Sequence, residues 1–188
     1  MRAVVALGNP GPEYIATRHN LGFWVSERLL RAGRWRRRVQ PWGEVYQRGE
    51  SLILRPLTYM NRSGEAVREL AACFALAPPD LLVVYDDVDL PVGEVRLRPA
   101  GGPGSHRGMQ SVLAALGTEE VPRLRVGIGA PPRGVDLVDY VLSPPPPEEA
   151  NVLACAADRA ARLALRFLEG GLVAALDSFS REGKGERV

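Results

Sequence analysis

The sequence is poor in several residue types, and each shortage excludes a class of protein. Only two of its 188 residues are cysteines, Cys73 and Cys155, and they lack the CxxC spacing of a metal or redox site. We expect both to be buried free thiols. No stretch approaches the ~18 apolar residues of a membrane span, and residues 1–7 lack the long apolar core and cleavage site of a signal peptide. We therefore expect a cytoplasmic protein with no membrane partner.

Lysine, histidine and asparagine are also scarce. The formal net charge is +2 at pH 7, and Lys184 is the only lysine. A nearly balanced charge does not by itself indicate a nucleic-acid partner, and the excess of arginine could reflect genome composition. Both histidines and three of the four asparagines lie in segments interrupted by glycine or proline, namely His19, His106, Asn9, Asn20 and Asn61. These rare side chains are candidates for a chemical role.

The distribution of apolar residues and chain breakers predicts alternating strands and helices. We expect strands at 2–7, 44–48, 51–55, 81–85, 94–98, 124–129 and 137–142. We expect helices at 21–32, 63–77 and 107–116, a long helix from the prolines at 144–147 to Gly170-Gly171, and a short helix after it. The basic run Arg34–Arg38 is expected in a loop, and residues 180–188 in a frayed, disordered tail.

This alternation predicts an α/β fold with three layers, in which a twisted β-sheet is flanked by helices. A hairpin around Gly49-Glu50 adds an antiparallel pair, so the sheet should be mixed. The chain length suits one domain with a full hydrophobic core. We therefore expect a single catalytic domain over residues 1–179.

Polar residues follow three of the predicted strands. The first polar segment runs from Asn9 through Tyr14 to His19, the second is 58–61, and the third is the acidic segment 86–91. Sites in α/β folds gather at strand ends. A neutral His19 takes a proton from water efficiently when a carboxylate holds its other ring nitrogen. The alternative is that His19 only caps a helix.

Other chemistries fit the sequence less well. There is no GxSxG motif and neither cysteine adjoins a histidine, which disfavours a covalent nucleophile. Two histidines without HxH or HExxH spacing make a poor ligand set, so we expect no metal at the acidic segment 86–91. The Gly-rich loop 100–104 is a candidate phosphate-binding loop, but it matches neither the P-loop nor the GxGxxG motif. The alternative is that it is a flexible surface loop. We expect no cofactor.

Six groups of residues occur in order along nearly the whole chain. They are Gly8-Asn9-Pro10-Gly11 with Tyr14, Thr17-Arg18-His19-Asn20, Met60-Asn61 with Ser63-Gly64, Asp86-Asp87-Val88-Asp89-Leu90-Pro91 with Gly93, Gly101-Gly102 with His106 and Gly108, and Arg125 with Gly127-Ile128-Gly129. Each is weak alone, but the ordered set is specific. It resembles the set found in bacterial-type peptidyl-tRNA hydrolases.

The resemblance implies a peptidyl-tRNA hydrolase-like (phosphorylase/hydrolase-like) fold and hydrolysis of the ester between a peptide and the 3′-terminal ribose of tRNA. This reaction recycles tRNA from peptidyl-tRNA that has left the ribosome. At the matching positions, His19 is the general base and Asp86 orients it. Asn9 positions substrate, and its amide or a backbone N–H would stabilise the oxyanion. The family is usually monomeric.

The resemblance also implies substrate-binding residues. Asn61 positions the peptide and water, and Tyr14 and Met60 line the cleft. Because an asparagine amide offers a donor and an acceptor together, it can pair with a peptide backbone whatever the peptide's side chains are. His106 and Arg107 are expected to contact substrate. Arg107 departs from the family, which usually has asparagine there. We expect it to contact RNA by charge, and the alternative is that it points away from the substrate.

Arginines are the candidates for binding tRNA. The resemblance implies that Arg98 and Arg125 hold the 5′-phosphate, and Arg suits bidentate phosphate binding. Arg96 should point to the same face of its strand as Arg98. The runs Arg34–Arg38 and Arg159, Arg162 and Arg166 contact either RNA or solvent.

Two other functions compete with the enzyme. One is a catalytically inactive RNA-binding relative, against which the presence of His19, Asp86, Asn9 and Asn61 argues. The other is a nucleoside- or phosphate-handling enzyme, for which the sequence offers no nucleobase pocket.

Overall fold

A seven-stranded mixed sheet forms the centre of the molecule. The structure, a computed structural model, describes residues 1–185. The strands are β1 (Arg2–Ala6), β2 (Arg36–Gln40), β3 (Gly43–Arg48), β4 (Ser51–Pro56), β5 (Leu81–Asp87), β6 (Val95–Arg98) and β7 (Arg123–Gly127). Their order is β2-β3-β4-β1-β5-β7-β6. Strands β4, β1, β5 and β7 are parallel, whereas β2, β3 and β6 pair antiparallel to their neighbours.

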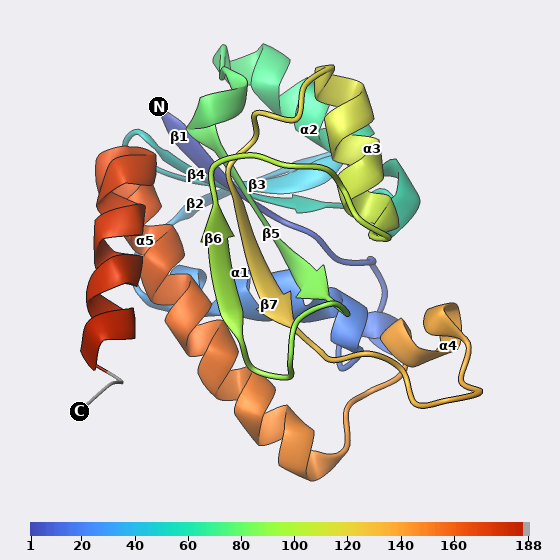
Figure 1. The fold of residues 1–188 in the computed structure, drawn as a ribbon. Helices are drawn as coiled ribbons and strands as arrows, with labels where there is room; N and C mark the ends of the chain where they lie inside the picture. The colour runs from blue at the N-terminus through green and yellow to red at the C-terminus, as the bar shows by residue number, and fades with distance from the viewer. Residues whose placement is uncertain (186–188) are drawn as a thin grey trace.

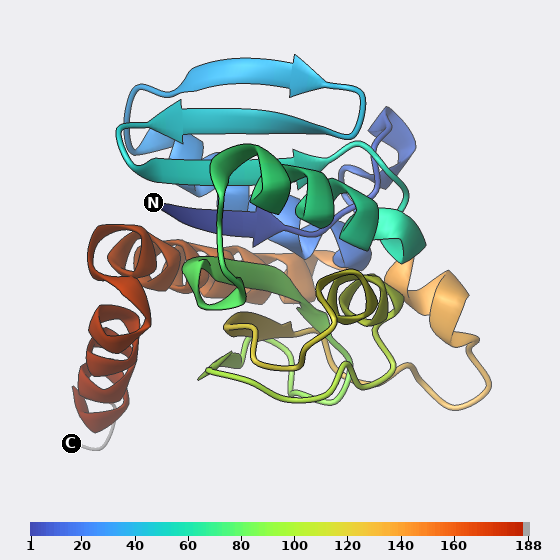
Figure 2. The ribbon, with the colours of Figure 1, turned by 90° about the horizontal axis from the view of Figure 1, so that it is seen from above.

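Helices cover both faces of this sheet. Helices α1 (Leu21–Arg31) and α5 (Pro147–Gly185) pack on one face, and α2 (Ser63–Phe74) and α3 (Arg107–Leu116) pack on the other, as Figure 1 and Figure 2 show. The short α4 (Leu137–Val141) lies beyond the carboxyl ends of the parallel strands (Figure 1). The three-layer α/β fold with a mixed sheet is confirmed.

Two apolar clusters fill the spaces between the sheet and its helices. Val4 and Val84 belong to the cluster under α1 and α5, whereas Val5 and Val83 belong to the cluster under α2 and α3. All four side chains are fully buried. Successive residues of a strand point to opposite faces, so a strand covered on both faces is apolar throughout. This is why the central strands were readable from uninterrupted apolar runs.

The chain leaves the sheet in opposite directions around β1. Helix α1 follows β1 on one face, and α2 follows the neighbouring β4 on the other. Such a reversal opens a crevice at the carboxyl ends of the strands. Gly22 brings α1 directly against the sheet, because a Cβ there would lie 2.3 Å from the carbonyl oxygen of Leu7 and 2.7 Å from that of Val84. The turn before α1 is therefore held at the ends of β1 and β5.

The predicted strand at 137–142 is wrong, because this segment forms α4. The side chain of Asp136 caps the helix by accepting hydrogen bonds from the backbone N–H groups of Val138 and Asp139. The other expected strands and helices are present, with small shifts of their ends.

Two further expectations are wrong. The basic run Arg34–Arg38 is not a loop over its whole length, because residues from Arg36 onward form the edge strand β2, paired with β3. Cys73 and Cys155 are free thiols, as expected, but both are exposed rather than buried.

The last helix is interrupted at Gly171, whose φ of 75° is not helical, so α5 consists of two helical segments as predicted. The expected tail begins inside the second segment, because the helix continues to Gly185, and residues 186–188 lie outside the described residues. Within residues 1–185, no helix combines the length and the apolar character that crossing a membrane requires.

Candidate active site

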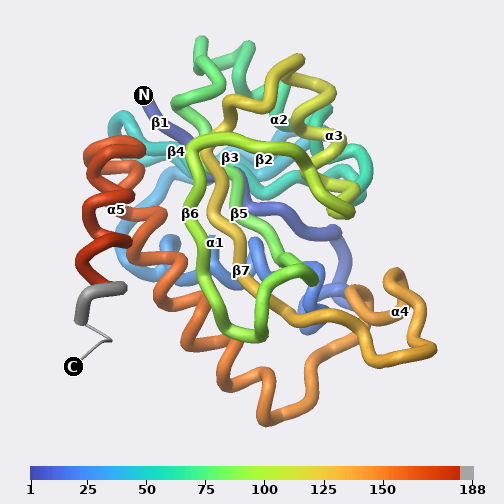
Figure 3. The backbone as a smooth tube through the Cα atoms, viewed as in Figure 1, coloured from blue at the N-terminus to red at the C-terminus, as the bar shows by residue number. Residues whose placement is uncertain are grey.

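Three turns meet beyond the carboxyl ends of β1, β4 and β5, and Figure 3 traces the chain through them. The turn after β1 contains η1 (Pro12–Tyr14) and η2 (Arg18–Asn20), and the turn after β4 contains η3 (Met60–Arg62). The turns border a cleft of about 790 Å³, together with the Gly-rich loop and α4. All predicted site residues except Arg96 line this cleft, namely His19, Asp86, Asn9, Tyr14, Met60, Asn61, His106, Arg107, Arg98 and Arg125.

The imidazole of His19 lies against the carboxylate of Asp86. The Nδ1 atom of His19 is 2.9 Å from Oδ1 and 3.0 Å from Oδ2 of Asp86. An ionised carboxylate only accepts hydrogen bonds, so Nδ1 carries the hydrogen and Nε2 keeps its lone pair. None of the described residues forms a hydrogen bond with Nε2. This tautomer leaves Nε2 available as a base.

His106 also holds Asp86. Its Nδ1 accepts a hydrogen bond of 3.1 Å from the backbone N–H of Met109, as the N-cap of α3, and its Nε2 lies 3.1 Å from Oδ1 of Asp86. Both ring nitrogens are thus engaged within the protein. The ring packs at a tilt between those of His19 and Tyr85, with centroid distances of 4.9 Å and 4.7 Å. His106 was expected to contact substrate, but neither of its ring nitrogens is free to form a hydrogen bond with it.

The charge on Asp86 controls the proton affinity of His19. Burial lowers the pKa of the His19 imidazole, but the charge of Asp86 and the hydrogen bond outweigh it, so the pKa is raised above its ordinary value of 6.5. Burial raises the pKa of the Asp86 carboxyl, but the charges and hydrogen bonds of His19 and His106 hold it well below its usual range. Asp86 is therefore ionised at neutral pH, and it stabilises the protonated form of His19.

Asn9 is fixed so that only its amide N–H₂ is free. Its Oδ1 accepts a 2.8 Å hydrogen bond from the backbone N–H of Met60, which identifies that atom as the oxygen. Its own backbone N–H and C=O pair with the side chain of Asn20 at 2.8 Å and 3.0 Å. The acceptor of the Asn9 amide is thus occupied within the protein. Asn61 is exposed, and it forms no hydrogen bond with the described residues through its side chain.

Among the described residues, one group of side chains has the composition of a metal site. It consists of His19, Asp86 and His106, whose candidate ligand atoms all lie within 4.8 Å of one another. The hydrogen bonds of 2.9–3.1 Å between them already account for the grouping. A metal there would take the Nδ1 hydrogen from His19 and with it the tautomer that frees Nε2.

Comparison with known proteins identifies the family. A sequence model described as "Peptidyl-tRNA hydrolase" matches residues 3–186. The chain belongs to the peptidyl-tRNA hydrolase family. It is 45% identical over 174 residues to the peptidyl-tRNA hydrolase of Aquifex aeolicus, and this alignment covers 90% of this chain and 91% of that protein. It is 42% identical over 186 residues to that of Symbiobacterium thermophilum, with 95% and 98% covered.

A solved structure agrees with the family assignment. The crystal structure of peptidyl-tRNA hydrolase from Acinetobacter baumannii superimposes with a TM-score of 0.87 at 32% identity, and the match covers 94% of this chain and 93% of that one. The sequence resemblance to peptidyl-tRNA hydrolases is therefore confirmed at the level of family and fold.

In this family member, four arginines share one face of β6 and β7. Arg96 pairs across the strands with Arg125, and Arg98 pairs with Arg123. Side chains directly opposite each other project from the same face of a sheet. Arg96 forms an ion pair with Glu94 at 2.5 Å and lies outside the cleft, which separates it from the other predicted tRNA contacts.

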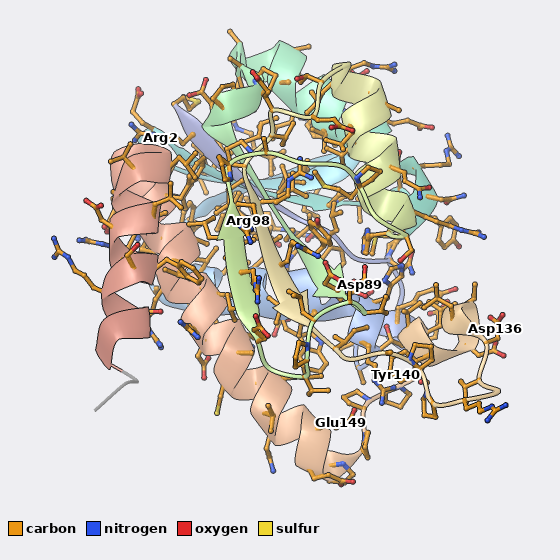
Figure 4. The ribbon with its side chains drawn as sticks, viewed as in Figure 1. Arg2, Asp89, Arg98, Asp136, Tyr140 and Glu149 are labelled. Carbon is orange, nitrogen blue, oxygen red and sulfur yellow. The ribbon has the colours of Figure 1, made fainter. Side chains whose placement is uncertain are left out.

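The cleft-lining arginines differ in their partners. Arg125 pairs with Asp87 through its Nε at 2.5 Å, and this side chain is 26% exposed. Arg98 and Arg107 are exposed and form no hydrogen bond or ion pair with the described residues. They are the unpaired cations of the rim. Figure 4 labels Arg98 on β6 and Asp89 in the turn that follows β5.

Sequence reasoning missed the residues that hold the site together. Arg123 is 2% exposed and donates to the backbone carbonyls of the Gly-rich loop, at Gly101 and Gly102. Asn20 was noted for its rarity, but its pairing with Asn9 was not predicted. Arg18 was noted only as part of a motif and is buried. Arginine is normally exposed, so nothing in the sequence alone distinguished Arg123 and Arg18 from arginines in contact with solvent.

Proposed function

We propose that the peptidyl-tRNA hydrolase activity of this chain operates through His19 as general base. Nε2 of His19 takes a proton from water while the water oxygen attacks the carbonyl carbon of the ester. The resulting tetrahedral oxyanion collapses, the bond from carbon to the ribose oxygen breaks, and His19 returns its proton to that oxygen. The products are a peptide carboxylic acid, which ionises to a carboxylate by releasing the second proton of the water, and a tRNA with a free 3′-terminal ribose.

Asp86 is assigned the role of orienting His19. Its hydrogen bond to Nδ1 fixes the tautomer, and its charge stabilises the imidazolium that forms when water is deprotonated. His106 in turn is assigned the role of positioning Asp86, because its Nε2 donates to the same carboxylate. Asp86 thus has its position fixed from two sides.

Asn9 is assigned to the oxyanion. Asn9 lines the cleft with His19, its Nδ2 has no partner among the described residues, and an amide N–H₂ is a suitable donor to the oxygen that gains charge. Because Oδ1 is held by the N–H of Met60, the amide cannot flip without losing that bond. Such a fixed donor needs no reorganisation during the reaction.

Peptide and RNA bind to different parts of the cleft. We assign Asn61, Tyr14 and Met60 to the peptide, since they come from the turns next to Asn9. An exposed asparagine amide recognises a peptide backbone without regard to side chains. We assign Arg98 and Arg107 to RNA phosphates, because they are the unpaired cations of the cleft, with a smaller part for Arg125.

Several coarser features belong to the same proposal. We propose that the chain acts as a monomer in the cytoplasm, that it needs no metal, and that residues 1–179 contain the catalytic domain. Its substrate is peptidyl-tRNA. The peptides carried by tRNA differ in sequence, which suits a site that recognises the peptide backbone through side-chain amides.

The observation that carries this proposal is the 2.9 Å contact between Nδ1 of His19 and Asp86, which leaves Nε2 free in the cleft. The test is release of an N-acetylated amino acid from N-acetylaminoacyl-tRNA by wild type and His19→Ala. We expect kcat to fall by about 10²–10⁴-fold while binding of the substrate persists. Full activity in His19→Ala would refute the mechanism, and tRNA binding without turnover by wild type would favour the inactive RNA-binding relative.

A further inference from the structure

Arg18 is a buried cation that the proposed chemistry does not use. Its side chain is 6% exposed and reaches into the junction between α4 and α5. Arginine is almost never buried without partners, because removing its charge from water is costly. The position next to His19 in η2 makes its partners relevant to the site.

The partners of Arg18 all lie on the segment from α4 to the first turn of α5. Nη1 donates to Oγ of Ser143 at 2.9 Å, to the carbonyl of Pro144 at 3.1 Å, and at longer range to the carbonyls of Ser143 and Tyr140. Nη2 pairs with Glu149 at 2.9 Å, and the guanidinium stacks 4.2 Å from the centre of the Tyr140 ring. Figure 4 labels Tyr140 and Glu149 where α4 leads into α5.

The backbone makes the same connection. The N–H of Arg18 donates to the carbonyl of Ser143 at 3.2 Å. Side chain and backbone of one residue therefore tie η2 to α4 and α5, and within the described residues only its Nε is left without a partner. On the other side, Asn20 ties the same turn to Asn9. The turn that carries His19 is thus anchored at both ends.

Helix α4 forms a wall of the cleft that His19 occupies. Leu137, Val138, Val141 and Leu142 line it, and the first two are 37% and 45% exposed. The anchor at Arg18 therefore fixes two parts of the cleft relative to each other, the base and an apolar wall against which substrate packs.

We propose that Arg18, held by Glu149, is a positioning residue that sets the orientation of His19 toward Asp86 and toward the α4 wall. This inference rests on the proposed role of His19. The guanidinium suits the task because it is planar and offers five donors in a fixed fork. A lysine at this position keeps the charge but cannot reach the carbonyls of α4 and the carboxylate of Glu149 at once.

The test compares Glu149→Gln with Asp158→Asn. Glu149→Gln is nearly isosteric and removes only the charge that holds Arg18. Asp158 also pairs α5 with an arginine, Arg28 on α1. Among the described residues the side chains of this pair have no hydrogen bond or ion pair with η2 or α4, so Asp158 is a matched control. Both variants should unfold within about 4 °C of each other, because each substitution keeps a side-chain oxygen that can accept from the arginine, and both acidic groups are partly exposed, Glu149 at 32% and Asp158 at 56%.

The activity readout separates kcat from KM. For N-acetylaminoacyl-tRNA we expect Glu149→Gln to lower kcat about ten-fold, because a small misplacement of a base is costly, with a KM change below about three-fold. Arg18→Lys should give a loss at least as large. Asp158→Asn should leave both constants at wild-type values.

The second readout does not depend on activity. The chain has only two histidines, so labelling histidine with ¹⁵N gives a simple NMR spectrum. The Nδ1 hydrogen shared by His19 and Asp86 should resonate far downfield in wild type and in Asp158→Asn, and should shift or broaden in Glu149→Gln. An unchanged resonance together with wild-type kcat in Glu149→Gln would overturn the proposal. If the resonance changes in Glu149→Gln but His19→Ala is fully active, the proposed role of His19 as the base is overturned instead.

Discussion

At the buried end of the cleft, Asp86 is 1% exposed and accepts hydrogen bonds from two histidines, whereas at the rim Arg98 and Arg107 are exposed and unpaired within the described residues. The two regions prepare for substrate in opposite ways. The buried end is oriented by the protein's own contacts, so it is ready before substrate arrives. The rim gains its partners only when an anion binds.

This difference predicts that substitutions at the buried end lower kcat, and that substitutions at the rim raise KM and respond to salt. Uniform binding energy affects KM, whereas an interaction made in the transition state affects kcat.

Asn9→Asp tests whether the free donor of Asn9 acts in the transition state. The new side chain keeps an acceptor for the N–H of Met60 but loses the N–H₂ group, which has no partner among the described residues. We expect kcat to fall about 10²-fold in single-turnover hydrolysis of N-acetylaminoacyl-tRNA. Asn9→Ala, which also loses the contact with Met60, should in addition be less stable to heat. An activity within a few-fold of wild type in both variants would show that Asn9 is only a structural residue.

Arg98→Ala and Arg107→Ala test the rim. Each should raise KM about ten-fold at low salt and leave kcat unchanged at saturating tRNA, because each removes one unpaired cation from the cleft. The slope of log KM against log salt concentration should fall by about one for each variant. If Arg107→Ala leaves affinity and salt dependence unchanged, its assignment to RNA is wrong, and the position differs from the family without consequence for RNA.

Arg96→Ala is the matched control for the rim and carries the smallest expected effect. Arg96 lies on the same face of β6 as Arg98, but it is paired with Glu94 and does not line the cleft. We expect KM to change by less than about two-fold at moderate salt. A change as large as that of Arg98→Ala would mean that RNA binding depends on the overall charge of the strand rather than on the cleft.

Much of the fold could be predicted because its central strands are apolar throughout and its helices end at glycine or proline. The exceptions are segments whose structure depends on distant partners. Residues 36–40 contain one apolar residue, Val39, and become a strand only through pairing with β3. Helix α4 has five residues, too few for a helical period, and its one local signal was the capping residue Asp136.

The candidate site was readable in its polar residues but not in their connections. His19 and Asp86 could be paired because a base needs a carboxylate, and the family resemblance supplied which one. That His106 would share Asp86 was not predictable, because the two are 20 positions apart and meet only through the packing of α3 on the sheet. The burial of Arg18 was likewise invisible, since its partners lie more than 120 positions along the chain.

If Asp86 raises the proton affinity of His19 and fixes its tautomer, removing its charge should change the pH dependence of kcat/KM. A general base must be unprotonated, so activity in wild type should be lost as pH falls through the pKa of His19, which lies above 6.5. In Asp86→Asn the charge that raises this pKa is gone while burial still lowers it. The acidic limb should therefore move to lower pH, and the plateau should fall about 10²-fold or more, because an amide no longer selects the Nδ1 hydrogen. An acidic limb at the same pH in both proteins, with plateaus within a few-fold, would contradict the account.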